Sequence, residues 1–111
     1  TGYGLAGHSW EMAERSDVRV VVDTEGIVAY PGALEAADAG ARTGGDPRNR
    51  DYLAGHLDST AAAGREALCF DPQTSGGLLA AVDPAAADQL LSQGFWRVGV
   101  AEAGDARLVL R

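Results

Sequence analysis

The stretch that most constrains the fold of this chain is Asp71-Pro-Gln-Thr-Ser-Gly-Gly77. It places a proline, two adjacent hydroxyl residues and a glycine pair directly before an apolar run at 78–82. Proline presets one backbone angle of a turn, and glycine reaches backbone angles that other residues avoid. We therefore expect a tight loop at 71–77, followed by a strand at 78–82 that is buried on both faces because it is apolar throughout.

A loop of this composition can direct several backbone N–H groups and two hydroxyls at one point, which suits an anionic ligand. It is not a Walker loop, because no lysine follows the glycines and a strand rather than a helix is expected next. The residues alone leave two interpretations open. The loop either needs glycine only for its shape, or it binds an anion.

The length and charge narrow the class of protein. The 111 residues are enough for one domain with a modest core, and the formal net charge of −7 argues against nucleic acid or an anionic membrane surface as a partner. No apolar run approaches the roughly 20 residues of a membrane span. The single Cys69 excludes an internal disulfide, as fits a cytoplasmic protein, and should be a small buried hydrophobic residue.

All nine cationic side chains are arginine. A phosphate site in so acidic a chain would therefore depend on main-chain amides, an arginine or a divalent metal. The most basic stretch lies at 41–51, which contains Arg42, Arg48 and Arg50, and it is either a solvated connector or an anion-facing or interdomain loop.

Hydrophobic spacing predicts the elements of the first part of the chain. We expect a helix at 5–15, a strand at 18–22, a short helix at 33–39, a loop at 41–51, a short strand at 52–57 and helical turns at 60–68. On the first helix, Glu11 and Arg15 are spaced for an ion pair. His8 lies at the border of the apolar stripe, either as a packing histidine or as a ligand contact.

The remaining elements follow the loop at 71–77. Asp83 should cap a helix that begins at Pro84 and ends at Gln93, with Ala87, Leu90 and Leu91 buried. Strands at 96–101 and 107–110 should then close an antiparallel hairpin. This order predicts an α+β domain, with a mixed β-sheet and helices packed on it.

Two other interpretations of the chemistry are weaker. The pattern Gly2-x-Gly4-x-x-Gly7 matches a dinucleotide-binding fingerprint, but the alternating βαβ order of a doubly wound sheet does not follow it. A complete active site is also not visible, because neither histidine has a partner at metal-ligand spacing and no nucleophile motif occurs. We predict no catalytic residue and no metal site within this chain, which should supply only part of a site.

Three motifs resemble one family. The Asp71–Gly77 run is similar to a signature of the selenophosphate synthetases (selenide, water dikinases), in the C-terminal domain that they share with aminoimidazole ribonucleotide (AIR) synthetase. Thr1-Gly-Tyr-Gly-Leu-Ala-Gly-His8 resembles the family's Thr-Gly-Phe-Gly-Leu-x-Gly-His helix opening. Gly44-Gly-Asp-Pro-Arg-Asn49 resembles its Gly-Gly-Thr-x-x-Asn loop, with Asp46 where a hydroxyl residue is usual.

The resemblance implies a single domain over 1–111 with an AIR synthase C-terminal-like fold, cut from a longer chain. The family makes selenophosphate, AMP and phosphate from ATP, selenide and water with Mg²⁺. Its reactive Cys or selenocysteine, essential Lys and most metal ligands lie in an N-terminal domain, which also forms the homodimer core. ATP lies between the two domains, so the chain alone should be inactive, with its own N-terminal domain as partner.

The resemblance also implies which residues contact the nucleotide phosphates: Thr1, Gly2, Gly4, Asp71, Gln73, Thr74, Ser75, Gly76 and Gly77. A second anion-binding or interdomain loop would contain Gly44, Gly45, Arg48 and Asn49, although Asp46 adds an anion that opposes phosphate binding there. Two alternatives are a noncatalytic module that binds a nucleotide or a partner, and another AIR synthase-like enzyme such as thiamine-monophosphate kinase.

Overall fold

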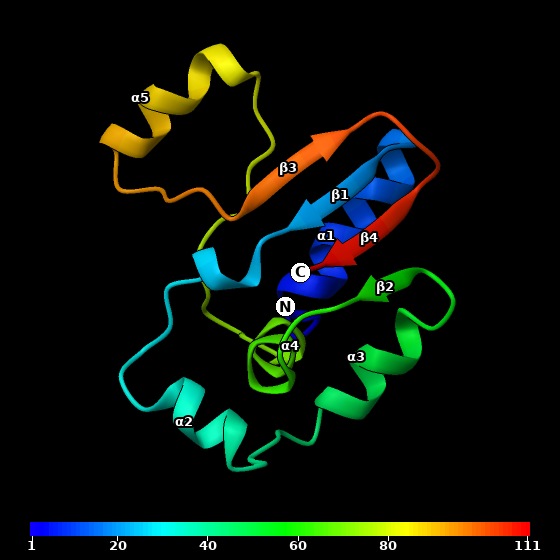
Figure 1. Cartoon of the computed structure of the whole chain (residues 1–111), viewed down its shortest axis with the longest axis vertical. Helices are drawn as coiled ribbons and strands as arrows, with labels where there is room; N and C mark the ends of the chain where they lie inside the picture. The colour runs from blue at the N-terminus through cyan, green and yellow to red at the C-terminus, as the bar shows by residue number, and fades with distance from the viewer.

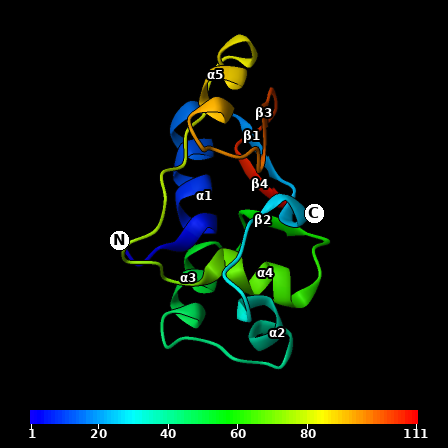
Figure 2. The ribbon, with the colours of Figure 1, turned by 90° about the vertical axis from the view of Figure 1, so that its left-hand side faces the viewer.

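A long helix covers one face of a four-stranded mixed sheet, and three shorter helices gather beyond the end of that helix (Figures 1 and 2). The computed structural model describes residues 1–111. In chain order the elements are α1 (Gly4–Ser16), β1 (Arg19–Val22), the 3₁₀ turn η1 (Thr24–Gly26), α2 (Ala33–Asp38), α3 (Asp46–Tyr52), β2 (Leu57–Ser59), α4 (Ala63–Phe70), the 3₁₀ turn η2 (Pro84–Ala86), α5 (Ala87–Ser92), β3 (Gly99–Glu102) and β4 (Arg107–Leu110). The predicted α+β class and mixed sheet are confirmed.

The sheet has the order β2-β4-β1-β3. β1 pairs antiparallel with β3 and parallel with β4, and β4 pairs parallel with β2. The expected antiparallel hairpin of the last two strands is therefore wrong, because β1 lies between them. Gly99 explains why β3 joins β1, since a Cβ at this position would lie only 2.0 Å from the carbonyl oxygen of Val21.

The core forms where α1 and α4 meet the sheet. The positions Ala6, Trp10 and Ala13 share one stripe of α1, at the spacing expected for a buried helix face. They pack with buried residues of the sheet and of α4: Val22, Leu108, Leu110, Cys69 and Phe70. The predicted helix at 5–15 and strand at 18–22 are thus confirmed, as is the helix at 33–39.

Cys69 is fully buried, as predicted, and burial raises the pKa of its thiol to about 12. A thiol with so high a pKa is almost entirely protonated near neutral pH, and it is the thiolate that reacts. Cys69 therefore has a packing role. None of the helices combines the length and apolarity needed to cross a membrane.

Two predictions for 41–57 are wrong. Residues 46–52 form the helix α3 rather than a loop, and the following strand is Leu57–Ser59 rather than 52–57. The dipeptide Asp46-Pro47 resembles a turn, but proline is tolerated in the first turn of a helix because its missing N–H has no partner there. Arg50, one turn along α3, pairs with Asp46 and supports the helix.

The expectations for the segment at 78–91 are wrong about burial. Residues 78–82 form no strand, and Leu78 and Val82 are 84% and 45% exposed. The helix predicted from Pro84 is present as η2 and α5, with Asp83 Oδ1 accepting a hydrogen bond from the Ala85 N–H at 2.8 Å. Its expected buried residues, Ala87, Leu90 and Leu91, are not buried.

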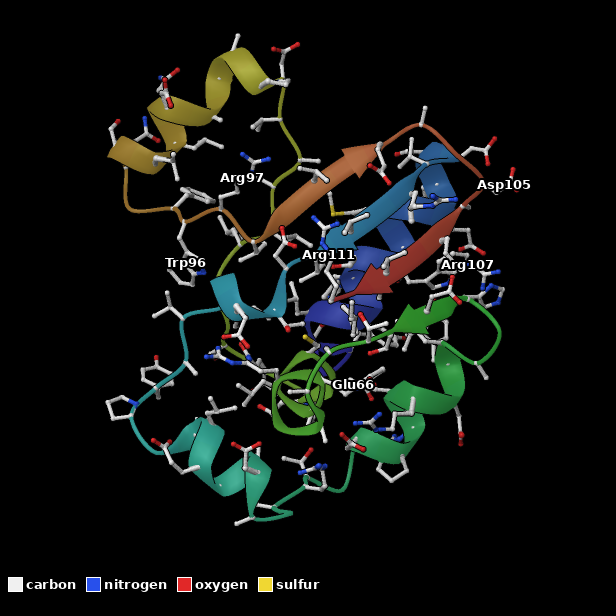
Figure 3. All side chains as sticks on the ribbon, in the orientation of Figure 1. Glu66, Trp96, Arg97, Asp105, Arg107 and Arg111 are labelled. Carbon is white, nitrogen blue, oxygen red and sulfur yellow. The ribbon has the colours of Figure 1, made fainter.

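The reason lies in the position of this segment. Figures 1 and 2 both show α5 standing away from the sheet beyond β3. It packs against η2, and neither element contains a buried residue. Trp96 and Arg97 lie on the connection from α5 to β3, far from Glu66 on α4 (Figure 3). An apolar pattern predicts that a segment is covered, but it does not identify the covering surface.

Candidate functional site

A cleft of about 440 Å³ brings together three parts of the chain that are far apart in sequence. The start of α1, the start of α3 and the loop after α4 contribute its lining residues: Thr1, Gly2, Tyr3, Gly45, Arg48, Asn49, Pro72 and Thr74. Figure 2 shows the chain start beside the segment that leaves α4. The three motifs singled out in the sequence therefore meet at one place.

A single buried amide holds the three parts together. Asn49 is only 5% exposed, and its Nδ2 donates hydrogen bonds to the carbonyl oxygens of Gly2 and Phe70, each at 2.9 Å. The first contact reaches the segment before α1 and the second reaches the end of α4. The Asn49 side chain thus fixes the position of both neighbours of α3.

Two glycines allow the loop after α4 to lie close against the starts of α1 and α3. Gly4 has a φ of +71°, and a Cβ at this position would lie 2.8 Å from the carbonyl oxygen of Asp71. At Gly45 a Cβ would lie 2.8 Å from Cγ of Pro72. Both contacts are shorter than a carbon side chain tolerates, so a larger residue at either position would displace the loop.

The glycine pair of the loop itself differs from the expectation. Neither Gly76 nor Gly77 has a positive φ, so the backbone angles reserved for glycine are not used there. Residues 73–77 are exposed, while Asp71 and Pro72 are half-buried. The loop lies at the surface, and Pro72 and Thr74 line the cleft.

The predicted site residues divide into two groups. The residues that line the cleft are Thr1, Gly2, Thr74, Gly45, Arg48 and Asn49. The others are outside its lining: Gly4, Asp71, Gln73, Ser75, Gly76, Gly77 and Gly44. Gln73 nevertheless lies next to it, because its carbonyl oxygen accepts a hydrogen bond from the Thr1 nitrogen at 3.4 Å.

Sequence reasoning missed Tyr3 and Pro72 as lining residues. Both lie within the motifs at 1–8 and 71–77, between residues predicted to contact phosphate, and that position was the available signal. A second, smaller hollow of about 240 Å³ lies between α2 and α4 and is lined by five alanines together with Leu68, Arg42, Thr43, Asp46 and Asp71. Its two carboxylates oppose an anion, so we place the candidate site at the cleft.

Arg48 supplies the positive charge of the cleft. It is exposed and has no ion-pair partner, whereas Arg19, Arg50, Arg65, Arg107 and Arg111 are each paired with a carboxylate. Because the cleft contains no carboxylate side chain, nothing in its lining neutralises this guanidinium. Hydroxyls, amides and one free arginine fit a phosphate group better than a metal ion.

Asp46 does not place its charge in the cleft. Its carboxylate is buried and accepts a hydrogen bond from Arg50 Nε at 2.8 Å, although its second oxygen, Oδ2, has no hydrogen-bond partner. Arg50 also donates to Glu66 at 2.6 Å. Burial alone would lower the pKa of the Arg50 guanidinium, but the hydrogen bonds to Asp46 and Glu66 raise it. The anion that opposed phosphate binding is thus neutralised away from the cleft.

A chain of hydrogen bonds runs from the edge of the cleft along α1. Thr1 Oγ1 lies 2.5 Å from His8 Nε2, and His8 Nδ1 lies 2.9 Å from Glu11 Oε2. The edge of the Tyr3 ring faces the imidazole, with ring centroids 5.9 Å apart. His8 is half-buried and contacts a cleft residue, and Glu11 pairs with His8 rather than with Arg15 as expected.

No group of three or more His, Cys, Asp or Glu side chains in the chain is arranged to hold a metal ion. The fold and the cleft together define an α+β domain with a surface cleft built from three glycine-containing segments, whose hydroxyls, amides and single guanidinium suit an anion. Comparison with known proteins adds the family. No protein-family model matches the chain.

Curated relatives match most of this sequence. It is 46% identical over 94 residues to the selenide, water dikinase of Pelobacter propionicus and 43% identical over 91 residues to that of Caldanaerobacter subterraneus subsp. tengcongensis. It is 36% identical over 126 aligned positions to the selenide, water dikinase of Nitratidesulfovibrio vulgaris. These matches cover 83%, 81% and 100% of this chain but 27%, 26% and 35% of the relatives.

The chain therefore belongs to the selenide, water dikinase family, the selenophosphate synthetases, and corresponds to the C-terminal part of those proteins. It spans about a quarter to a third of the length of the curated relatives that it matches. The resemblance stated from the three motifs is confirmed.

Proposed function

We propose that this chain is the C-terminal domain of an ATP-dependent selenophosphate synthetase and forms one wall of its nucleotide-phosphate cleft. The full-length enzyme converts ATP, selenide and water into selenophosphate, AMP and phosphate. The observation that carries the proposal is the convergence of three motif segments on one cleft, with the unpaired Arg48 at its side. The match to selenide, water dikinases supports the same assignment.

The residues of this chain bind and orient the phosphates. The hydroxyls of Thr1 and Thr74 and the guanidinium of Arg48 are the side-chain donors that line the cleft. Gly2, in the segment just before α1, lines the cleft and adds a main-chain donor, and the amide of Gly4 in the first turn of α1 has no partner within the helix. Mg²⁺, when bound, neutralises phosphate charge, and its carboxylate ligands come mainly from outside this chain.

The remaining groups come from an N-terminal domain of the same protein. That domain supplies the reactive Cys or selenocysteine, the essential Lys and most metal ligands, and it forms the core of a homodimer in the cytoplasm. The share of the relatives that this chain covers leaves room for such a domain. The exposed apolar side chains Leu78, Val82 and Trp96 support a surface that a neighbouring domain covers.

The nature of the nucleotide product tests the proposal. The full-length protein should convert ATP to AMP when selenide is supplied, and the 111-residue chain alone should turn over no ATP. Formation of ADP as the final product would assign the protein to an ordinary phosphotransferase such as a thiamine-monophosphate kinase. Turnover by the isolated chain would contradict the division of the site between two domains.

A further inference from the structure

The directions of the hydrogen bonds around His8 follow from the chemistry of the groups. A carboxylate only accepts, so His8 Nδ1 carries a hydrogen and donates it to Glu11 Oε2 over 2.9 Å. A neutral imidazole has one N–H, so its Nε2 is an acceptor and receives the hydroxyl hydrogen of Thr1 over 2.5 Å. Glu11 thereby fixes the tautomer of His8, and His8 fixes the hydroxyl of Thr1.

This arrangement conflicts with anion binding at Thr1. The one hydroxyl hydrogen of Thr1 points to His8, and Thr1 Oγ1 also accepts a hydrogen bond from the Tyr3 N–H at 3.4 Å, so toward the cleft this side chain presents only a lone pair. A phosphate oxygen is also an acceptor, and two acceptors repel each other. While His8 is neutral, Thr1 therefore cannot donate to a phosphate group in the cleft.

Protonation of His8 removes the conflict. An imidazolium donates from both nitrogens, so Nδ1 keeps its bond to Glu11 and Nε2 donates to Thr1 Oγ1. The hydroxyl hydrogen of Thr1 is then free to turn to the cleft. The change adds one proton from solvent to His8 Nε2 and breaks no covalent bond. It also adds a positive charge next to Thr1, at the edge of the cleft that Arg48 lines, in a chain that has no lysine.

We propose that His8 takes up one proton when a phosphate group binds in the cleft, and that this proton changes Thr1 from a hydrogen-bond acceptor into a donor. The proposal rests on the proposed function of the cleft as a phosphate site. His8 is then a positioning residue of that site, with Glu11 setting its tautomer. Binding of the anion and protonation of His8 stabilise each other.

Other charged, titratable and polar groups lie around the Thr1–His8 pair. On α1 they are Glu11, Glu14 and Arg15, together with the Tyr3 ring just before the helix. From α3, Arg48 lines the cleft with Thr1, and the Tyr52 ring lies 5.6 Å from that of Tyr3. Burial raises the pKa of Tyr52, and the charges of Glu11 and Glu14 raise it further, so its phenol stays neutral. The loop after α4 contributes the Gln73 carbonyl oxygen beside the Thr1 nitrogen.

Proton-linked calorimetry with sulfate tests the proposal in the full-length protein. Sulfate has the shape and charge of a phosphate dianion but does not titrate near neutral pH, so any proton taken up goes to the protein. Titrations at about pH 8, where an ordinary imidazole is neutral, in two buffers of different ionisation enthalpy should report about one proton per sulfate bound. The sulfate affinity should fall up to about tenfold per unit as the pH rises.

Two histidine variants separate proton uptake by His8 from proton uptake by His56. His8→Gln has no titrating ring, so sulfate binding should take up no proton and its affinity should not change with pH over this range. His56→Gln is the matched control, because the His56 ring stacks on Trp10 at 4.3 Å and does not line the cleft. It should keep the proton uptake of the unchanged protein. Equal uptake in His8→Gln and in the unchanged protein would overturn the proposal.

Nitrogen-15 shifts of the His8 ring provide a direct readout. The free protein should show the Nδ1–H tautomer, and saturation with sulfate should protonate both nitrogens. Sulfate that binds without protonating His8 would overturn this inference while leaving the phosphate cleft intact. Sulfate binding that does not compete with ATP and does not weaken in Arg48→Gln would instead contradict the proposed function.

Discussion

The two ends of this molecule differ in how they are held. At the cleft, side chains from several elements are tied to one another, by Asn49 between Gly2 and Phe70 and by Arg50 between Asp46 and Glu66. At the other end, residues 78–96 expose Leu78, Leu91 and Trp96 and contribute no buried residue. The cleft wall is thus complete within this chain, whereas the outlying segment has an apolar surface without a cover.

The two ends therefore differ in how far contacts within this chain hold them in place. Directional hydrogen bonds to main-chain carbonyls fix the cleft without help from a neighbour. Apolar residues that face water gain little until another surface covers them. The comparison predicts that substitutions at the cleft end change stability far more than matched substitutions in the outlying segment.

The two tryptophans give the largest contrast. Trp10 is 5% exposed in the core, and Trp96 is 51% exposed on the connection to β3. Replacing Trp10 with alanine should lower the free energy of unfolding of the 111-residue chain by about 3–5 kcal/mol, because it opens a cavity under α1. Trp96→Ala should lower it by less than about 1 kcal/mol. Denaturant titration of both variants measures the difference in unfolding free energy, and equal losses would contradict the different packing of the two ends.

Asn49→Ala should have the next largest effect. It leaves the carbonyl oxygens of Gly2 and Phe70 without their donor, at a loss of about 2–3 kcal/mol in unfolding free energy. It should also weaken ATP binding by the full-length protein, since Gly2 lines the cleft. Gln93→Ala, an exposed position after α5, is the control and should stay within about 0.5 kcal/mol. An Asn49→Ala variant as stable as this control would show that the two hydrogen bonds of the Asn49 side chain do not stabilise the fold.

The smallest effect concerns Glu66 and acid. Burial would raise the pKa of its carboxyl, but hydrogen bonds from Ser59 and Arg50 lower it below the ordinary value of 4.5. A carboxyl with a lowered pKa in the folded state stabilises the protein above its unfolded pKa, and this stability is lost as the pH falls through the folded pKa.

The stability of Glu66→Gln should therefore differ from that of the unchanged chain at neutral pH and approach it below about pH 4. Denaturant titrations at several pH values measure the two curves. A constant difference between the curves at all pH values would show that Glu66 is not held as an ion in the fold.

The sequence predicted well those features that depend on local pattern. The stripe Ala6, Trp10 and Ala13 identified α1. Two motifs, at 1–8 and 71–77, indicated one shared cleft, whereas the motif at 44–49 was expected to form a second loop. The two hydrogen bonds of Asn49 were not predictable, because no local pattern shows which carbonyl oxygens accept from a buried amide. The helix α3 was missed because Gly44-Gly45 and Pro47 favour a turn when tertiary contacts are ignored.

The order of the sheet was equally out of reach of pattern reasoning. The strands at 99–102 and 107–110 are close in sequence, which favours a hairpin, yet β1 lies between them and pairs with both. The apolar run at 78–82 predicts a buried strand, because apolar side chains are stabilised when another surface covers them. The pattern does not show whether that surface belongs to this chain or to a neighbouring domain.

The most direct test of the cleft compares two arginines in the full-length protein. Arg48 and Arg97 are both exposed and without an ion pair, but only Arg48 lines the cleft. We predict that Arg48→Gln raises the KM for ATP by about tenfold, the loss expected for one charge-assisted phosphate contact, and that Arg97→Gln leaves it unchanged. Equal KM values for the two variants and the unchanged enzyme would contradict the assignment of this cleft to the nucleotide phosphates.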